Sequence, residues 1–322
     1  MFKSVSAAVA ALVVAVPTYA QTTWQMPTPY PDASVVTRNV KQFAEEVREA
    51  TGGKLNIVVH TTGSLIKHGE IKNAVRSGQV QIGEILASTL SNDDPVFEMD
   101  SLPFLVENFA DAEKLWGVVK EHLRDNIGRQ RMTLLFANSW GPQGLYSKAA
   151  VNSTADMRGA RFRAYNYTTE RIAQLAGAVP TQVEAADLAQ AFSTGRANMM
   201  VTSTATGVSA AVWDFLDHYY DVRVSIPFDI ILVNNKALEA LEPDVRKALL
   251  EVAARAEKRS WSMAEEDDKK NLKTLADNGL TVEPGSDQLR AELKKIGETM
   301  SAEWEKKAGD KGAALLKEYK SR

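Results

Sequence analysis

The sequence contains no cysteine. No disulfide can therefore stabilise the fold, and a cysteine nucleophile or a thiolate metal site is excluded. Histidine is scarce, with four in 322 residues, and no two have the spacing of a His-Glu-x-x-His zinc motif. We predict no metal site and interpret each of the four as a surface or strand-end histidine: His60, His68, His122 and His218.

The motifs of common catalytic and nucleotide-binding sites are also missing. There is no Gly-x-Ser-x-Gly nucleophile elbow, no phosphate-binding loop and no Gly-x-Gly-x-x-Gly fingerprint. Two carboxylate runs, at 93–94 and 265–268, are weak general acid/base candidates. The second lies in a helical pattern, where adjacent side chains point in different directions. We therefore predict no cofactor and no catalytic site.

An excess of positive charge is absent, because 38 lysines and arginines face 41 aspartates and glutamates, for a net charge of −3. Binding to nucleic acid depends on such an excess, so nucleic acid is not expected as a partner.

Long apolar runs are absent as well, and a membrane-spanning helix takes about 20 residues. A shorter run, Ala7 to Val16, follows Lys3 and precedes Ala20. A basic start, a short apolar core and a small final residue are typical of a secretory signal. An apolar first helix of a cytoplasmic domain fits this pattern less well. We predict a periplasmic protein without a membrane anchor, cleaved near Ala20.

What the sequence does contain is an alternation of strand and helix patterns. Strand candidates at 22–26, 54–61 and 80–86 alternate with helix candidates at 34–50 and 71–77. This order predicts a largely parallel, doubly wound α/β sheet.

The alternation restarts in a second α/β region, and a later strand returns the chain to the first one. We predict a fold of two α/β lobes with a hinged cleft between them, where ligands bind. The signal covers 1–20, the first lobe 21–140 plus about 229–267, and the second lobe 141–228 plus about 268–322 with the C-terminal helices. The other predicted elements are strands at 133–140, 145–148, 160–166 and 229–235, and helices at 169–176, 186–193, 243–277 and 288–307.

Arginines concentrate in the stretch MRGARFRAYN, from Met157 to Asn166. On a strand, Arg161, Arg163 and Tyr165 would share one face. Arg158, beside a glycine, is expected in solvent, and a surface role is favoured for Arg161. In a protein without net positive charge, the cluster needs a local explanation.

Several segments, in their order and spacing, resemble the substrate-binding proteins of tripartite ATP-independent periplasmic (TRAP) transporters, the DctP-type family. The resemblance covers essentially the whole chain after the signal. The segments are FAEEVREATGGKLNIVVHTTGSL, VRSGQVQIGE, DSLPFLVEN, STADMRGARFRAYN, LAGAVPTQVEAADLAQAFSTGRANMMVTS and ILVNNKALEALEPDVRKALLE.

This resemblance implies a type II-like periplasmic-binding-protein fold, with hinge strands and a long helix spanning both lobes. It implies closure over one small organic acid and delivery to a membrane permease. Arg163 holds the place of the arginine that clamps the substrate carboxylate, and Asn166 matches a polar pocket position. A guanidinium suits this task because its planar fork makes two parallel bonds to a carboxylate. The alternative for Arg163 is a surface or inter-strand ion pair.

One departure from the family pattern narrows the expected ligand. Where many members carry a second arginine, this chain has Gln143. A neutral amide cannot balance a second negative charge, so a monocarboxylate is favoured. Aromatic residues near these positions predict a ligand with an apolar or aromatic body, and packing in the core or hinge is an equal alternative. They are Trp140, Tyr165, Tyr167 and Trp213.

Further candidates follow by position, with less support. Thr28 follows the first strand, and Thr202 follows the segment RANMMV. Phe228 precedes the returning strand, and Glu84 lies inside the third strand, where a side chain pointing to solvent is the alternative.

The function predicted from these residues is that of a periplasmic receptor that binds an organic acid without turning it over. An exported enzyme acting on organic acids is the alternative from another class, and the absence of paired acid/base groups beside Arg163 disfavours it. A binding subunit that presents its closed form to a membrane kinase is a third possibility. The predicted partners are therefore the organic acid and the membrane subunits of a TRAP permease.

Overall fold

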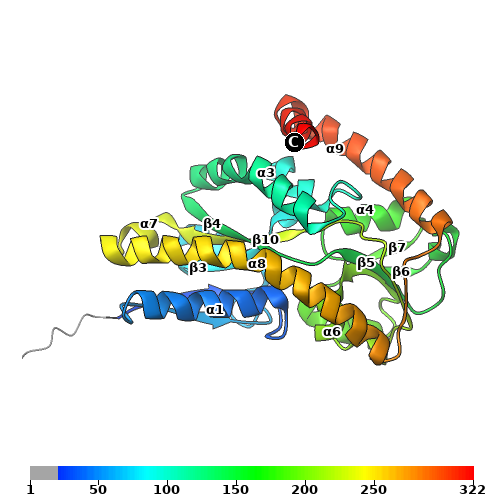
Figure 1. Ribbon diagram of the computed structural model, residues 1–322, viewed down its shortest axis with the longest axis horizontal. Coiled ribbons are helices and arrows are strands. Elements are labelled where there is room, and N and C mark those ends of the chain that lie inside the picture. Colours follow the sequence, from blue (N-terminus) through cyan, green and yellow to red (C-terminus); the bar gives the residue numbers. More distant parts are fainter. Residues whose placement is uncertain (1–20) are drawn as a thin grey trace, which may run out of the picture.

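The computed structural model describes residues 21–322. The predicted signal and its cleavage site near Ala20 lie outside these residues. The described chain forms two α/β lobes, side by side in Figure 1 and joined by strands and one long helix.

The first lobe contains two small sheets. Strand β1 (Thr22–Pro27) pairs in parallel with β2 (Leu55–His60). Strand β10 (Phe228–Asn234) lies between β3 (Ile82–Leu86) and β4 (Met132–Ser139) and is antiparallel to both. The prediction of a largely parallel sheet is wrong here, because β4 leaves this lobe for the second and β10 returns beside it.

Helices cover these sheets on both faces. In α1 (Val35–Ala50), the predicted apolar stripe is buried, with Val36, Val40 and Phe43 inaccessible to solvent. The sequence analysis did not identify α3 (Phe109–Arg129), which begins where the Asn108 side chain accepts from Asp111 N–H. The other helical elements of this lobe are η1 (His68–Glu70), α2 (Ile71–Ser77), η2 (Ala87–Leu90), η3 (Pro95–Ser101) and α7 (Asn235–Glu239).

The second lobe is built on one six-stranded sheet in the order β11-β9-β5-β8-β6-β7. Its strands are β5 (Gln143–Ser147), β6 (Arg161–Ala164), β7 (Val179–Gln182), β8 (Met199–Ser203), β9 (His218–Tyr220) and β11 (Thr281–Glu283). Its helical elements are η4 (Thr154–Met157), α4 (Tyr167–Leu175), η5 (Ala185–Asp187), α5 (Leu188–Ser193), α6 (Thr204–Ser209) and η6 (Val212–Asp214).

Two kinds of connection join the lobes. The helix α8 (Pro243–Asp277) has the predicted bounds, packs against α1 in the first lobe and α6 in the second, and runs along both (Figure 1). The chain segments that cross between the lobes run side by side, because Trp140 N–H donates to Pro227 O at 3.0 Å and Gln143 N–H donates to Ser225 O at 2.9 Å. The predicted fold, with hinge strands and a spanning helix, is confirmed.

The C-terminal helix α9 (Asp287–Ser321) is longer than predicted and contacts both lobes. It bends at Gly309, where φ is 61°. Past its contacts with the second lobe, α9 reaches the first lobe, where Trp304 and Tyr319 pack into the apolar cluster. Trp304 Nε1 donates to Pro95 O at 2.7 Å. This arrangement ties the end of the chain to α3, as Figure 1 shows.

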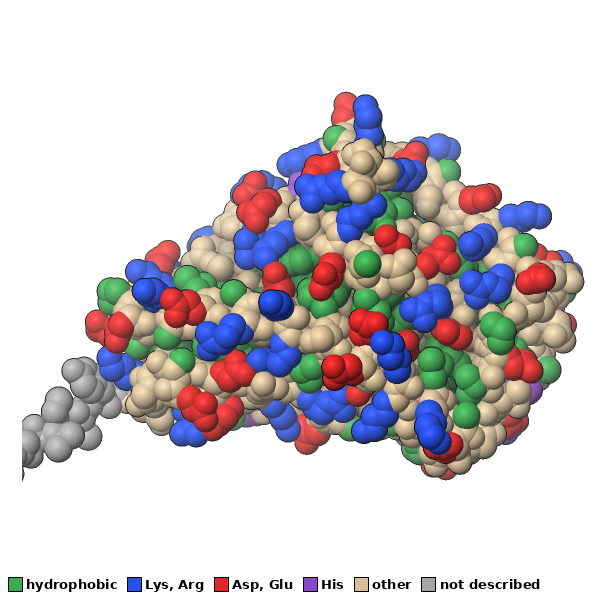
Figure 2. All heavy atoms as spheres, in the orientation of Figure 1, with side chains coloured by type: hydrophobic (Ala, Val, Ile, Leu, Met, Phe, Trp, Pro, Cys, Tyr) green, Lys and Arg blue, Asp and Glu red, His purple; other side chains and the backbone are tan. Residues whose placement is uncertain are grey.

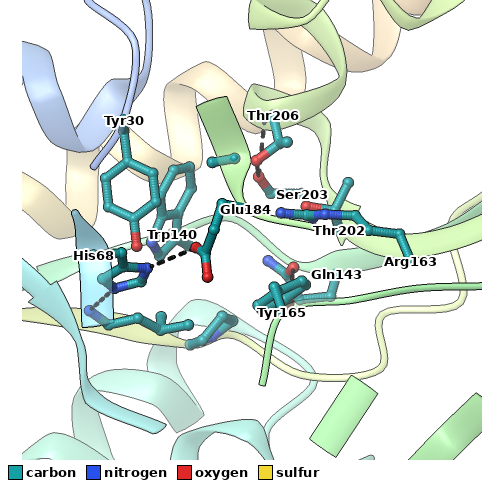
Figure 3. Close-up of a pocket in the computed structure, with 13 residues that line it drawn as sticks. Tyr30, His68, Trp140, Gln143, Arg163, Tyr165, Glu184, Thr202, Ser203 and Thr206 are labelled. Carbon is teal, nitrogen blue, oxygen red and sulfur yellow. Dashed lines mark hydrogen bonds and ion pairs between the residues drawn. The ribbon is translucent and has the colours of Figure 1, made fainter. Parts of the chain in front are cut away.

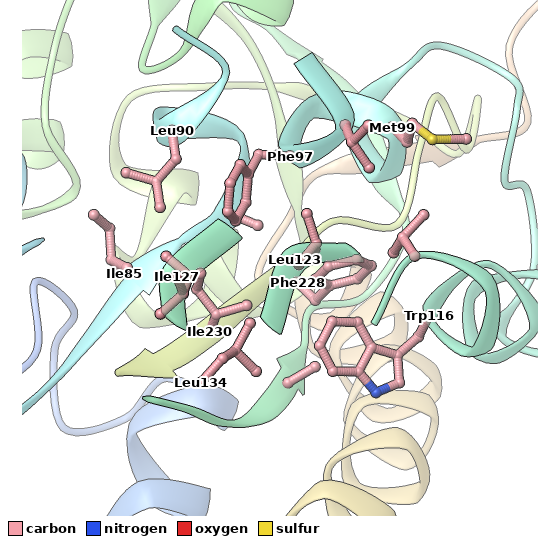
Figure 4. Close-up of a cluster of buried hydrophobic side chains, with 14 of the residues drawn as sticks. Ile85, Leu90, Phe97, Met99, Trp116, Leu123, Ile127, Leu134, Phe228 and Ile230 are labelled. Atoms are coloured by element: carbon pink, nitrogen blue, oxygen red, sulfur yellow. The ribbon is translucent and has the colours of Figure 1, made fainter. Parts of the chain in front are cut away.

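The largest apolar cluster lies in the first lobe around β10, between α3 and η3 (Figure 4). Phe228, Ile230 and Phe97 are almost fully buried in it. On the face drawn in Figure 2, lysine and arginine side chains are interspersed with aspartate and glutamate. None of the helices within residues 21–322 is both long and apolar enough to cross a bilayer.

Close packing in the second lobe makes Gly144 sensitive to substitution. A Cβ at this position of β5 would lie 2.3 Å from the ring of Tyr219, which is fully buried against Tyr146. We expect Gly144→Ala to lower the free energy of unfolding by about 1–3 kcal/mol, because overpacking forces the core to shift. Urea unfolding measures this change.

The matched control is Gly128→Ala in α3, where an added Cβ meets nothing within 4 Å. Alanine is the better helix former, so this variant should be more stable than the parent by about 0.5–1 kcal/mol. Equal stability of the two variants would contradict the packing argument.

Candidate functional site

A small cavity with a volume of about 40 Å³ lies between the two lobes (Figure 3). Residues from both lobes and from the crossing segments form its wall, as expected for a hinged fold. The first lobe contributes Tyr30, His68 and Leu86, the crossing segments Trp140 and Pro227, and the second lobe Gln143, Arg163, Tyr165, Glu184, Ala185, Thr202, Ser203 and Thr206.

Arg163 is a buried cation in this wall, with 3% of its surface exposed. Its Nε donates to Val183 O at 3.1 Å, and its guanidinium lies over the Tyr165 ring, 4.5 Å from the centroid. Within residues 21–322 no carboxylate forms an ion pair with it. Burial lowers its pKa, yet a guanidinium stays protonated in proteins. A buried charge of this kind requires a counterion, which a ligand anion would supply.

Tyr165 and Gln143 form a polar pair beside Arg163. Tyr165 OH donates to Gln143 Oε1 at 3.1 Å, and Gln143 Nε2 donates to Gly141 O at 2.8 Å. Burial raises the pKa of Tyr165 to about 12, so its hydroxyl stays a donor at neutral pH. Both ends of the amide are thus held by the protein.

Two aromatic rings form another part of the wall. Tyr30 and Trp140 meet edge to face, with ring centroids 4.8 Å apart. Tyr30 OH donates to Asp229 Oδ1 at 3.0 Å, which fixes its ring. Such a wall offers apolar surface to the body of a ligand.

Behind this wall lies a fully buried pair of carboxylates, Glu84 and Asp229. Glu84 Oε2 accepts from Thr28 OH at 2.5 Å, and Glu84 Oε1 accepts from Asn138 Nδ2 at 2.8 Å. Burial raises the pKa of Glu84 to about 7. Burial, and next the charge of Glu84, raise the pKa of Asp229 well above its usual range, so the pair retains a proton at neutral pH.

Polar contacts join the lobes around the cavity. His68 Nδ1 lies 3.4 Å from Glu184 Oε2, and Asn166 Nδ2 donates to Ser88 Oγ at 2.9 Å. Asn166 also caps α4, since its Oδ1 accepts from Thr169 N–H at 2.9 Å. Two direct polar contacts therefore join the lobes.

The structure brings five of the predicted site residues to the cavity: Arg163, Gln143, Trp140, Tyr165 and Thr202.

The other five lie elsewhere, and their binding roles stay predictions. Asn166 lies at the contact between the lobes. Thr28 and Glu84 lie behind the wall, and Glu84 is buried rather than facing solvent. Phe228 packs in the core, with its ring centroid 5.2 Å from that of Trp116. Trp213 packs against a separate apolar cluster of the second lobe.

Of the neighbouring residues, Tyr167 and Arg161 are exposed, and so is Arg158. Arg161 Nε donates to Gly195 O at 2.5 Å. The guanidiniums of the cluster therefore do not act together, and only Arg163 belongs to the cavity wall.

Several cavity residues were not predicted from the sequence. His68 was interpreted as a surface histidine, but it is 9% exposed and faces Glu184. Glu184 follows β7, a strand that the sequence analysis missed. Recognising that strand would have identified Glu184, because ligands bind at the carboxyl ends of strands in such sheets. Tyr30 and Thr206 carried no local signal of their own.

Comparison with known proteins adds to this geometry. Residues 28–307 match the family model described as bacterial extracellular solute-binding protein, family 7 (DctP). The structure is similar to DctP7 of Bordetella pertussis, an extracytoplasmic solute receptor binding pyroglutamic acid, with 44% identity and a TM-score of 0.91. The alignment covers 93% of this chain and 99% of that one.

Two other solved structures have comparable TM-scores at lower sequence identity. DctP6 of B. pertussis, also described as binding pyroglutamic acid, is 37% identical with a TM-score of 0.92, over 94% of this chain and 100% of that chain. A marine metagenome TRAP solute-binding protein specific for pyroglutamate is 36% identical with a TM-score of 0.91, over 94% of this chain and 99% of that one.

The buried carboxylate pair predicts a pH-dependent effect of Glu84→Gln. In the folded protein the pKa of Glu84 is about 7, above the value near 4 of an unfolded glutamate. Its contribution to stability is therefore present at low pH and lost as the pH rises through this window. We expect the stability of Glu84→Gln relative to the parent to increase by about 2–4 kcal/mol from pH 4.5 to 7.5.

Urea unfolding of both proteins at several pH values measures this difference. Glu170→Gln, on the exposed surface of α4, serves as the control and should show no such trend. A stability difference between parent and Glu84→Gln that does not vary with pH would contradict the raised pKa.

Proposed function

The chain belongs to the DctP family of bacterial extracellular solute-binding proteins, and we propose that it is a periplasmic receptor for a small cyclic monocarboxylate of the pyroglutamate type. It is a binding protein and not an enzyme, in line with the description of its family as solute-binding. In this proposal the two lobes close over the acid, and the closed form delivers it to the membrane subunits of a TRAP permease. The signal is removed near Ala20 on export.

The observation that carries the proposal is the buried, unpaired guanidinium of Arg163 in a cavity between the lobes. A ligand carboxylate would accept two parallel, charge-assisted bonds from it. No described carboxylate lies within ion-pair distance of this guanidinium, and the charge of Glu184 acts on it only from a distance, so the ligand carboxylate would be its direct counterion. The relatives that bind pyroglutamate share 36–44% of the sequence, which supports a ligand of the same class.

The wall of the cavity supports a single carboxylate on a compact body. Arg163 is the one arginine or lysine among the lining residues in the described part of the chain. The Gln143 amide is already engaged by Tyr165 and Gly141. A second ligand carboxylate would therefore be buried without a cation, at a high cost in free energy. Tyr30, Trp140 and Tyr165 suit a small ring.

The first test is Arg163→Ala. Loss of a buried charge-assisted pair costs about 2–5 kcal/mol, so the Kd for pyroglutamate should rise at least roughly thirtyfold. Isothermal titration calorimetry measures it. The matched control is Arg161→Ala on the same strand, whose exposed side chain lies outside the cavity wall and whose loss should leave the Kd unchanged. Near-native affinity of Arg163→Ala would refute the proposed role.

The second test is a thermal-shift screen over monocarboxylates, dicarboxylates, aromatic acids and sugar acids. A ligand that binds only the folded state raises the Tm by mass action. We expect pyroglutamate to raise the Tm by several degrees and glutarate, a dicarboxylate of similar length, to have no effect. Stabilisation by dicarboxylates alone would overturn the proposal.

Delivery to a permease, as opposed to a membrane kinase, is tested by uptake of labelled pyroglutamate in cells that lack this protein.

A further inference from the structure

The cavity contains a second charge, of opposite sign to that of Arg163. The carboxylate of Glu184 lies at the cavity in Figure 3, between His68 and Gln143. Arg163 and Glu184 come from neighbouring strands, because β6 pairs in parallel with β7, which ends two residues before Glu184. A negative charge is unexpected in a site for an anion, and its presence therefore requires an explanation.

Hydrogen bonds keep this carboxylate ionised. His68 Nε2 accepts from Leu86 N–H at 3.3 Å, so in the neutral ring the proton sits on Nδ1. From there His68 donates to Glu184 Oε2 at 3.4 Å. This bond, more than any other interaction, lowers the pKa of Glu184, and the charge of Arg163 lowers it further. Glu184 is thus an acceptor and cannot donate to a ligand.

The two charges impose opposite requirements on a ligand. The end at Arg163 must be an anion, and the group at Glu184 must be a hydrogen-bond donor, because a second acceptor there would be repelled. Pyroglutamate carries both, since its ring N–H is attached to the carbon that bears the carboxylate. We infer that Glu184 is a specificity-determining residue that accepts the ring N–H and so selects lactam acids over acids of the same shape without that donor.

This inference rests on the proposed function and extends it, because it assigns a donor, and not only an anion, as the requirement for binding. A role of Glu184 restricted to the contact between the lobes is the competing explanation, since His68 and Glu184 belong to different lobes. The two explanations differ in one respect. Loss of a contact between the lobes weakens every ligand equally, whereas loss of an acceptor weakens only ligands that donate to it.

The test compares two ligands and two variants. The ligands are pyroglutamate and 5-oxotetrahydrofuran-2-carboxylate, freshly dissolved, in which the ring N–H is replaced by oxygen and the carboxylate is retained. In Glu184→Gln, the Nδ1–H of His68 holds the amide oxygen, so the amide NH₂ faces the ligand. This group repels a ring N–H but tolerates a ring oxygen. The control is Glu170→Gln, an exposed change of the same charge on α4.

Calorimetry should show that the parent and Glu170→Gln bind the lactam at least about tenfold more tightly than the lactone, since a hydrogen bond to a charged group contributes about that factor or more. In Glu184→Gln the ratio should fall to about one or reverse. An unchanged ratio, with either equal losses or no loss for the two ligands, would overturn the role of Glu184 alone. If the parent binds neither compound, the proposed function fails and the inference with it.

Discussion

The unpaired positive charge of Arg163 is the constraint on which the rest of the site depends. A guanidinium with 3% exposure has lost most of its hydration, and the described chain gives it one backbone carbonyl and an aromatic face in return. Such a group is costly unless an anion arrives. In the proposed receptor, this cost would couple occupation of the cavity to closure of the two lobes around the ligand.

The remainder of the cavity wall is consistent with this use of charge. Glu84 and Asp229 lie directly behind Tyr30, and two ionised carboxylates there would compete with the ligand for the field of Arg163. Their raised pKa values mean that the pair retains a proton, and its hydrogen bonds position the aromatic wall instead. Strong burial thus converts an acidic cluster into a largely structural one.

Much of the fold could be predicted from the sequence, because apolar periodicity and glycine stops are local signals. The helix at 243–277 and the strand around Arg163 were predicted in this way. The antiparallel direction of β10 could not be predicted in this way, since it depends on how the chain returns from the second lobe to the first. In the site, Arg163 was identified from a motif. His68 was not identified, because its place in the wall depends on a contact with a residue 116 positions away. Glu184 was not identified, because the strand before it was missed.

The arrangement of charge in the cavity determines the orientation of the ligand more than its affinity. Arg163 alone would accept any small carboxylate, in any rotation about the guanidinium axis that the walls permit. A fixed acceptor at Glu184 adds a second point of contact, which an asymmetric ring satisfies in one orientation only. Paired charges of opposite sign generally determine register and exclude wrong partners rather than add affinity. The closed lobes would therefore present one ligand geometry to the permease, and the selectivity of the receptor would follow from the geometry of two side chains.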